Sequence, residues 1–396
     1  MRRFALLIAG LALLAAVAAT VSGGGTQAKT RWMITDLGWK GWAVGINGRG
    51  QVIGNGAKHA ILWEKGKMRD LGTLGGESST AVAINERGQI VGNRWFRMKD
   101  KYGTEIVHAF LWENGKMRDL GTLGRKWSRA VAINDRGQIV GLTSEDAGER
   151  PRAFIWENGK MRDLGSLGTK TPVTVMAINN RGQVIGNEGW SAEERAFLWE
   201  KGKLRDLGTL GGSHSNVYAI NDHSQIVGRS TLANREWWRA TLWENDRIRN
   251  LGTDGWAVAI NDQGQIIGST WPGAFFWQRG KISYISGSGS KTEAVALNDR
   301  GEVVGYRWST DCGEMAGMRD EPIPRAFVWV NGKMTVLPTL RGGDASLPGP
   351  PAYEHFFPSP SGVINDRGQI VGWSTTSQGD YCNSPVHAVL WTLKRG

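Results

Sequence analysis

Aromatic and basic side chains are the residues of this sequence whose types and spacing suggest chemistry. The chain of 396 residues contains 20 Trp but only 6 Tyr and 2 Cys, and its formal net charge is +11. Indole rings stack on sugar rings and on peptide side chains, and exposed aromatic patches usually mark contact sites. The composition therefore points first to a binding surface.

Catalytic motifs are absent from the sequence. It contains no nucleophile elbow, His-Glu-x-x-His, phosphate-binding loop or dinucleotide fingerprint. The six His lack the close pairing of metal ligands, so no metal site is predicted. An enzyme would have to assemble acids from several loops. The first acids to test would be Glu314, Asp320, Glu321, Asp344 and Glu354. We expect a binding module, with a hydrolase or lyase acting on a polysaccharide or peptide, or a protein-protein interaction scaffold, as alternatives.

The N-terminal segment indicates export. A basic start, Met1-Arg2-Arg3, precedes an apolar run over 4–21 and then small residues, which is the pattern of a cleaved signal peptide. An uncleaved anchor is the alternative, although the run barely reaches the ~18 to 20 residues that a membrane span needs. We predict a signal peptide and short linker at 1–30. The mature protein is then secreted, periplasmic or at the cell surface, without a transmembrane segment.

One pattern recurs eight times along the rest of the chain. An Asn that follows Ile or Leu is succeeded by a Gly seven residues later, and then by a Trp that closes an Ala-x-x-Trp. The eight Asn are Asn47, Asn85, Asn134, Asn179, Asn221, Asn261, Asn298 and Asn365. Three fixed positions in eight copies indicate a repeat architecture.

Each copy is predicted to contain four short strands separated by tight turns. In the second copy these strands cover 81–84, 89–92, 108–112 and 117–121, and the Gly of the first turn supplies a positive φ. Four-stranded units of roughly this length are typical of β-propeller blades. We predict an all-β chain in which 31–396 form a single β-propeller of eight four-stranded blades, with seven blades as the alternative.

The two ends of the chain complement each other. The last copy stops after Trp391 without its fourth strand, and residues 33–38 stand before the first Asn as an extra fourth strand. Joining them would complete the last blade and remove exposed strand edges, which promote aggregation. A β-solenoid or two separate sandwiches would not explain this deficit. We therefore predict that an N-terminal strand closes the ring.

Three blocks recur in order along the chain. They are Ile-Asn-Asp-Arg-Gly-Gln-Ile-Val-Gly at 133–141, His-Ala-Phe-Leu-Trp at 108–112, and Gly-Lys-Met-Arg-Asp-Leu-Gly at 115–121. The blocks resemble the bacterial extracellular HAF-repeat family, named for a His-Ala-Phe triplet, and the resemblance covers 31–396. It implies an exported, propeller-forming protein and no established activity. The literal triplet occurs once, and Ser224 departs from the pattern at a turn Gly.

The predicted strand order determines which loops share a face. If the small first strand is innermost, the Asn-Asp-x-Gly and Asn-Gly-Lys turns lie on one face, the bottom face. The loops after the second strand and the links between blades lie on the other, the top face. The bottom turns are nearly uniform, whereas the top loops vary in length, and the longest link, 338–362, includes Tyr353 and His355. Loops on rigid scaffolds carry function, so we predict that the top face binds the ligand.

The tryptophans divide between blade cores and the top face. Eight close the repeats and are expected to pack between blades: Trp63, Trp112, Trp156, Trp199, Trp243, Trp277, Trp329 and Trp391. Eleven fall in top-face segments, where they either plug the loops against one another or form stacking platforms. The candidate ligand contacts among these are Trp95, Trp190, Trp237, Trp238, Trp271, Trp308 and Trp373.

A basic residue stands immediately before the repeat Ala in seven of the eight copies, and Gly273 is the exception. The seven are His59, His108, Arg152, Arg195, Arg239, Arg325 and His387. They would ring the top rim, where they either bind neighbouring loops and acidic partners or hold an acidic glycan or other anion. All but His59 are candidate ligand contacts, as are Tyr353 and His355.

The positive charge is weak support for a nucleic-acid partner. Twelve Lys and Arg belong to predicted fourth strands around the outside, where periodic charge usually protects a strand edge. A nucleic-acid groove would need them clustered. We expect a glycan or protein ligand outside the cell, no nucleic acid, and a monomeric protein.

The Asn-Asp-x-Gly turns present oxygen atoms that Ca²⁺ could bind. The Asp is replaced in three copies, by Gly48, Glu86 and Asn180, so turn-stabilising hydrogen bonds explain these residues better. No cofactor is predicted, and Ca²⁺ is a weakly supported alternative.

The two cysteines fall in equivalent top loops of neighbouring copies. Cys312 and Cys382 follow their repeat Gly by seven and ten residues. An oxidising compartment favours pairing. We predict a disulfide between them, with free thiols as the alternative.

Overall fold

Runs of β-branched and aromatic residues separated by Gly-containing turns form the strands of this protein. The computed structural model describes residues 31–97, 104–145, 150–168, 171–189, 194–233, 235–271, 273–285, 291–309, 323–341, 343–349, 362–377 and 385–394. Within these ranges, no helix is long and apolar enough to cross a membrane. The predicted signal peptide at 1–30 lies outside the described residues.

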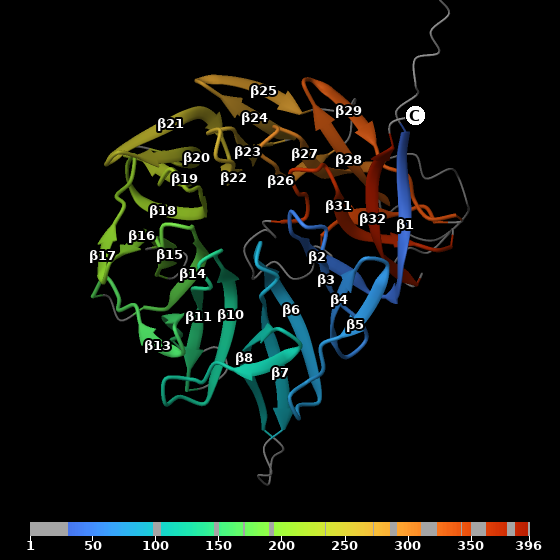
Figure 1. Ribbon diagram of the computed structural model, residues 1–396. Helices are drawn as coiled ribbons and strands as arrows, with labels where there is room; N and C mark the ends of the chain where they lie inside the picture. The colour runs from blue at the N-terminus through green and yellow to red at the C-terminus, as the bar shows by residue number, and fades with distance from the viewer. Residues whose placement is uncertain are drawn as a thin grey trace, which may run out of the picture.

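Eight antiparallel sheets of four strands each are arranged in a ring (Figure 1). Blade 1 contains β2 (Trp42–Ile46), β3 (Val52–Asn55), β4 (Ala60–Glu64) and β5 (Lys67–Asp70). Blade 2 contains β6 (Ser78–Ile84), β7 (Ile90–Arg97), β8 (Glu105–Glu113) and β9 (Lys116–Asp119). Blade 3 contains β10 (Trp127–Ile133), β11 (Ile139–Ser144), β12 (Arg152–Glu157) and β13 (Lys160–Asp163). Blade 4 contains β14 (Val173–Ile178), β15 (Val184–Glu188), β16 (Arg195–Glu200) and β17 (Lys203–Asp206).

The second half of the ring continues the same order. Blade 5 contains β18 (Gly211–Ile220), β19 (Ile226–Leu232), β20 (Arg235–Glu244) and β21 (Arg247–Asp254). Blade 6 contains β22 (Trp256–Ile260), β23 (Ile266–Ser269), β24 (Ala274–Gln278) and β25 (Lys281–Ile285). Blade 7 contains β26 (Thr292–Leu297), β27 (Val303–Ser309), β28 (Ile323–Val330) and β29 (Lys333–Val336). Blade 8 contains β30 (Ser346–Pro348), β31 (Ile370–Thr375), β32 (Val386–Lys394) and β1 (Arg31–Lys40).

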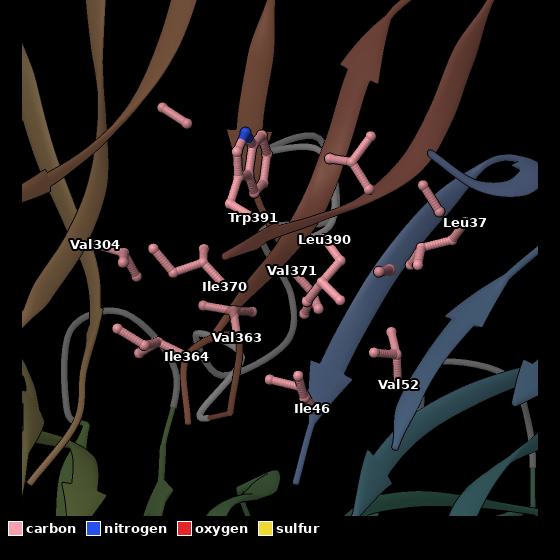
Figure 2. Packing of buried hydrophobic residues seen from close by; sticks show 14 of the residues in the cluster. Leu37, Ile46, Val52, Val304, Val363, Ile364, Ile370, Val371, Leu390 and Trp391 are labelled. Atoms are coloured by element: carbon pink, nitrogen blue, oxygen red, sulfur yellow. The ribbon is translucent and has the colours of Figure 1, made fainter. Parts of the chain in front are cut away.

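The ring is closed as the sequence predicts. The N-terminal strand β1 pairs with the C-terminal strand β32, with Ile34 opposite Trp391, and so supplies the fourth strand of blade 8 (Figure 1). Behind this pair lies a hydrophobic cluster that joins Leu37 of β1 to Leu390, Ile370 and Ile46 (Figure 2). Strand pairing and core packing therefore both join the two ends of the chain. The predictions of eight blades and of closure by an N-terminal strand are confirmed.

Blade 8 differs from the other blades in its first strand. The segment 338–362, expected to be a link, contains β30, which pairs with β31 through Leu347 and Trp373. Residue Ile364, just before the repeat Asn365, forms an isolated bridge with Ile370 of the same β31. The first strand of blade 8 is thus made from two separated pieces, and the chain between them is an insertion within that strand.

The hydrophobic core is divided into clusters that lie between successive blades. Trp112 of blade 2, for example, packs with Leu62 and Leu71 of blade 1. Seven of the eight repeat Trp are at most 8% exposed, and Trp63 is half-buried against its cluster. The prediction that these indoles form the core between blades is confirmed.

The repeat Gly on the second strand is required by a close approach. At Gly141, a Cβ would collide with the backbone carbonyl of Arg129 on the first strand and lie 2.7 Å from the ring of Phe154. The same pair of obstacles, a first-strand carbonyl and the repeat Phe, surrounds Gly92, Gly186, Gly268 and Gly305. The Phe ring therefore covers the backbone where the first strand bulges, and no side chain fits beneath it.

We expect Gly141→Ala to lower the free energy of unfolding by about 2 to 3 kcal/mol, because the added methyl group has no space. Gly45→Ala is the matched control, since Gly45 lies in a first strand and its nearest neighbour would be 3.5 Å from an added Cβ. Six other copies carry Ala at that position. Urea unfolding of both variants measures the difference, and equal stability would contradict the close-approach explanation.

The eight repeat Asn form a closed ring of hydrogen bonds around the bottom face. The side-chain N–H of each Asn donates to the backbone carbonyl of the Asn in the next blade, at 2.9 to 3.1 Å, and Asn365 donates to Asn47. Each Asn is 2 to 6% exposed. The ring therefore joins every neighbouring pair of blades through one residue.

Each Asn also organises its own turn. In blade 3, the side-chain oxygen of Asn134 accepts the N–H groups of Arg136 and Gln138, and its second N–H donates to the side chain of Gln138. All of its donors and acceptors are thereby used. Gly137 in this turn has the predicted positive φ of 82°, and Ser224 adopts 65° at the same place in blade 5.

We expect Asn134→Ala to lower the free energy of unfolding by about 3 kcal/mol, because several buried hydrogen bonds lose one partner. Asn134→Asp keeps the acceptor atoms, but at neutral pH its carboxylate faces two oxygen atoms to which Asn134 donates. We therefore expect this variant to lose more unfolding free energy than Asn134→Ala at neutral pH. At low pH the protonated acid can donate a hydrogen bond, so the difference between the two variants should become smaller. Gln263→Ala, an exposed residue of the same turn in blade 6, is the control. Similar unfolding curves for all three variants would rule out an energetic role for the ring.

Candidate functional site

Exposed indoles on the top face gather in blades 5 and 6. Trp271, in the loop after β23, is 85% exposed, and Trp237, near the start of β20, is 76% exposed. Trp256, at the first residue of β22, is 40% exposed. Burying an aromatic side chain is strongly favourable in water, so three such rings in solvent require an explanation other than folding.

Backbone contacts connect the segments that carry these residues. The N–H of Gly255 donates to the carbonyl of Trp238, which places the link to blade 6 beside the third strand of blade 5. Trp256 then pairs with Ser269 of β23, two residues before Trp271. We call the four residues Trp237, Trp238, Trp256 and Trp271 the aromatic patch.

Trp238 is the anchored member of the aromatic patch. The guanidinium of Arg229 lies 4.0 Å from the centroid of its ring, and His214 packs edge-on at 5.9 Å. The Nε of Arg229 donates to the buried Asn216. This chain of contacts fixes Trp238 to blade 5 and leaves Trp237 and Trp271 as the most accessible indole rings.

Other top-face tryptophans plug the loops instead. Trp373, a candidate ligand contact, is 4% exposed and packs with Tyr306, Ala345 and Leu347. Trp308 is half-buried against this cluster, in edge contact with Tyr306 at 5.7 Å. The structure therefore presents neither Trp373 nor Trp308 as an open stacking surface, because neighbouring blades cover them. Trp95 is half-buried and pairs with Val107, and Trp190 lies outside the described residues.

The basic residues before the repeat Ala form ion pairs within the sheets. Their partners are carboxylates of the fourth strands: His59 with Asp70, His108 with Asp119, Arg152 with Asp163, Arg195 with Asp206, Arg239 with Asp254 and His387 with Asp36. The contact distances lie between 2.6 and 2.9 Å. For six of the seven basic residues, the structure therefore shows an ion pair with an acidic partner. This was one of the two alternatives expected from the sequence.

The aspartates in these pairs have a second task. One oxygen of Asp119 accepts the N–H of Gly121, while the other contacts His108 and Arg94. Asp70 and Asp163 bond in the same way to Gly72 and Gly165. Sequence reasoning missed the Asp as the partner of the basic residue, although four of the pairs share a separation of 11 residues.

Asp119 is the most strongly bound of these carboxylates. Burial alone would raise the pKa of the Asp119 carboxyl, but hydrogen bonds from His108, Arg94 and Gly121 outweigh burial and hold it well below its ordinary value. A depressed folded-state pKa adds stability above the unfolded value of about 3.9, and this stability is lost as pH falls below it.

We expect Asp119→Asn to lower the free energy of unfolding at pH 7 by about 1 to 2 kcal/mol, since two charge-assisted hydrogen bonds are lost. The gap between variant and wild type should shrink as pH falls through about 4 and lower. Urea unfolding at several pH values measures it. Asp246→Asn, at a largely exposed site, is the control, and a gap independent of pH would contradict the assignment.

The bottom face carries a second, open series of contacts beside the Asn ring. In seven of the eight blades, the residue after the repeat Asn accepts the N–H of its counterpart in the preceding blade, as Asp135 does from Glu86 and Asp299 from Asp262. Gly48 has no side chain, so it cannot accept the corresponding bond from blade 8. Burial raises the pKa of the Asp299 carboxyl, the Asp262 N–H lowers it, and the charges of neighbouring aspartates raise it further.

These carboxylates act as acceptors for backbone N–H groups. Asn180 donates its side-chain N–H groups to Asp135 and to Asp222 and so bridges two of them. Among the described residues, no group of three or more His, Cys, Asp and Glu is arranged to hold a metal ion. The weakly supported Ca²⁺ alternative gains no support from this geometry.

Several predicted residues lie outside the part of the chain that the structure describes. They are Tyr353, His355, Cys312 and Cys382, and the acids Glu314, Asp320, Glu321 and Glu354. The predicted disulfide is therefore still a prediction. Asp344, the remaining candidate acid, has its N–H and a carboxylate oxygen hydrogen-bonded to Thr375.

Comparison with known proteins identifies the fold. No protein-family model and no curated protein matches the chain. Dipeptidyl peptidase 4 from Porphyromonas gingivalis is similar with a TM-score of 0.56 and 8% identity, over 90% of this chain and 58% of that protein. The β-propeller domain of the Trilobed protease from Pyrococcus furiosus has a TM-score of 0.47 and 11% identity, over 76% of this chain and 98% of that domain. A streptogramin B lyase has a TM-score of 0.45 and 10% identity, over 92% of this chain and 98% of the lyase.

At these identities, similarity shows a shared fold and nothing about activity. The chain is a β-propeller. The resemblance to the HAF-repeat family is not confirmed by a family model and stays a prediction.

Proposed function

We propose that this protein is an exported binding module that recognises a carbohydrate through the aromatic patch on its top face. The observation that carries the proposal is the exposure of Trp237 and Trp271, at 76% and 85%. Indole rings offer flat apolar faces that stack on the C–H faces of sugar rings. Their N–H groups remain free to bond hydroxyl oxygens.

The scaffold suits such a role. The hydrogen-bonded Asn ring and the interblade cores hold the bottom face rigid, while Trp238 is anchored by Arg229 beneath the loops. Binding groups held by rigid elements lose little conformational freedom when a ligand arrives. The aromatic patch therefore combines accessible rings with a fixed support.

The proposal includes the cellular context that the sequence indicates. The basic and apolar start of the chain supports export through a cleaved signal peptide. The recurrent Ile-Asn-Asp-Arg-Gly and Asp-Leu-Gly blocks support membership of the HAF-repeat family. A glycan of the cell surface or of the medium is then the ligand within reach.

We expect soluble oligosaccharides to quench or shift the intrinsic tryptophan fluorescence, and Trp237→Ala and Trp271→Ala each to weaken binding by about tenfold or more. A panel of chitohexaose, cellohexaose and oligogalacturonate, titrated into the purified protein, tests this. Tyr284→Ala is the matched control, because Tyr284 is a 61% exposed aromatic residue on the outer strand β25.

The control separates the aromatic patch from general surface effects. Equal binding by wild type and both Trp variants would remove the aromatic patch from the function. An absence of any response across a broad glycan array, together with a surface protein captured reproducibly by wild type and lost in Trp271→Ala, would replace the carbohydrate by a protein partner.

A further inference from the structure

Blades 2 and 7 carry a pair of facing basic residues at matching positions. In blade 2, Arg94 of β7 lies opposite His108 of β8. Both contact the carboxylate of Asp119, at 2.5 Å from Arg94 and 2.7 Å from His108. In blade 7, Arg307 of β27 lies opposite Arg325 of β28 in the same register. The two blades therefore place two cations at equivalent points of the sheet.

The carboxylate between them is missing from blade 7. Asp119 pairs with Phe110, two residues beyond His108. At the equivalent position, Phe327, two residues beyond Arg325, pairs with Val336. An uncharged side chain thus stands where blade 2 has its acid. Like charges that face each other across a sheet repel, so Arg307 and Arg325 lack the compensation found in blade 2.

The charge of these guanidinium groups is not compensated elsewhere in the described residues. No ion pair joins either arginine to a described residue, and the Nε of Arg307, like that of Arg94 in blade 2, is buried without a hydrogen-bond partner. The nearby Glu293 is already engaged, by Lys291 at 3.1 Å and by the hydroxyl of Tyr306 at 2.6 Å. Val336 is 40% exposed, so the place of the missing acid is open to solvent.

This face of blade 7 is directed toward blade 6. Arg325 and Phe327 are two residues apart on one strand, so their side chains share a face. Phe327 packs with Ala274 and Ile285 of blade 6. Blade 6 has Gly273 where other copies have a basic residue, and Trp271 of the aromatic patch lies two residues earlier. Arg307 and Arg325, which form no ion pair with a described residue, are therefore next to the blade that carries the most exposed indole.

We propose that blade 7 binds the carboxylate of an acidic sugar between Arg307 and Arg325, beside Val336. The site corresponds to the place that the Asp119 carboxylate occupies in blade 2. Guanidinium groups bind carboxylates through paired, charge-assisted hydrogen bonds. This inference rests on the proposed function and narrows its ligand from any carbohydrate to one that contains uronic acid residues.

Blade 2 shows what such a site does to a carboxylate. Burial raises the pKa of the Asp119 carboxyl, yet the hydrogen bonds from His108 and Arg94 more than reverse this effect. Two facing arginines without a carboxylate between them among the described residues attract negative charge at least as strongly, because arginine stays protonated throughout the physiological range.

Trigalacturonate is the probe, titrated into the full-length mature protein by isothermal calorimetry. We expect Arg325→Gln and Arg307→Gln to bind it at least tenfold more weakly than wild type. Val336→Asp should weaken trigalacturonate binding to the same extent, because the new carboxylate takes the place in blade 7 that Asp119 has in blade 2 and occupies the two arginines. His59→Gln is the matched control, since His59 occupies the same position in blade 1 but is paired with Asp70, and its affinity should equal that of wild type.

Val336→Asp also gives a readout that needs no sugar. Its thermal midpoint should rise by roughly 1 to 3 °C, because the added carboxylate relieves the repulsion between the arginines. Sodium acetate should raise the midpoint of wild type above that in sodium chloride of equal ionic strength, and should not do so for Val336→Asp. An identical response of both proteins to acetate would overturn the anion site.

The outcomes separate this inference from the proposed function. Trigalacturonate binding that is equal in wild type and Val336→Asp, with neutral oligosaccharides still dependent on Trp271, would overturn the carboxylate site and leave the proposed function intact. A wild-type protein that binds none of the sugars would contradict both the carboxylate site and the proposed function. Hexaglutamate that binds more tightly than trigalacturonate, and only when Arg325 is present, would overturn the sugar in favour of an acidic peptide.

Discussion

The architecture depends on one interaction that is repeated around the ring, the hydrogen bond from each repeat Asn to the backbone of the next blade. The bond is buried and joins side chain to main chain, and the same side chain folds the turn from which it projects. The same residue thus stabilises both its own hairpin and the contact with the next blade. Such agreement between local and long-range interactions is typical of sequences that have one well-defined native state. It also explains why Asn is present in all eight copies while the residue after it varies. Asn has the two donors and the acceptor that these contacts use, and Gln, which carries the same groups, holds them one methylene further from the backbone of the turn.

Periodic features of the sequence predict the scaffold well, because every blade repeats the same physical problem. The four strands, the positive φ of turn residues such as Gly137 and the closure by residues 33–38 all follow from spacing. The partner of the basic residues does not follow as easily. His108 and Asp119 belong to different strands, and the contact becomes visible only when the register between β8 and β9 is known. The fixed separation of 11 residues is a signal that a comparison of the copies contains.

The top-face tryptophans mark where sequence reasoning ends. Trp373 and Trp271 follow their repeat Gly by one and three residues, Trp373 within β31 and Trp271 in the loop after β23. One is buried beneath neighbouring blades and the other is in solvent. Trp373 packs with Tyr306 of blade 7 and with Leu347 of its own blade, whereas Trp271 lies in solvent. Burial of an isolated loop residue depends on such neighbours, and neither composition nor spacing describes them. A departure from the repeat, such as Gly273 or Val336, is therefore more informative about function than a position that conforms.

Closure of the ring has a consequence for the time at which the protein can finish folding. The bond from Asn365 to Asn47 spans 318 residues, and the contact between His387 and Asp36 spans 351. A chain emerging from the ribosome can form its early blades from neighbouring residues, but the first strand has no partner until the last strand has been made. Until then the growing molecule is an open arc with two unpaired ends. Synthesis of β32 is thus the step that converts a linear array of blades into a single cooperative unit.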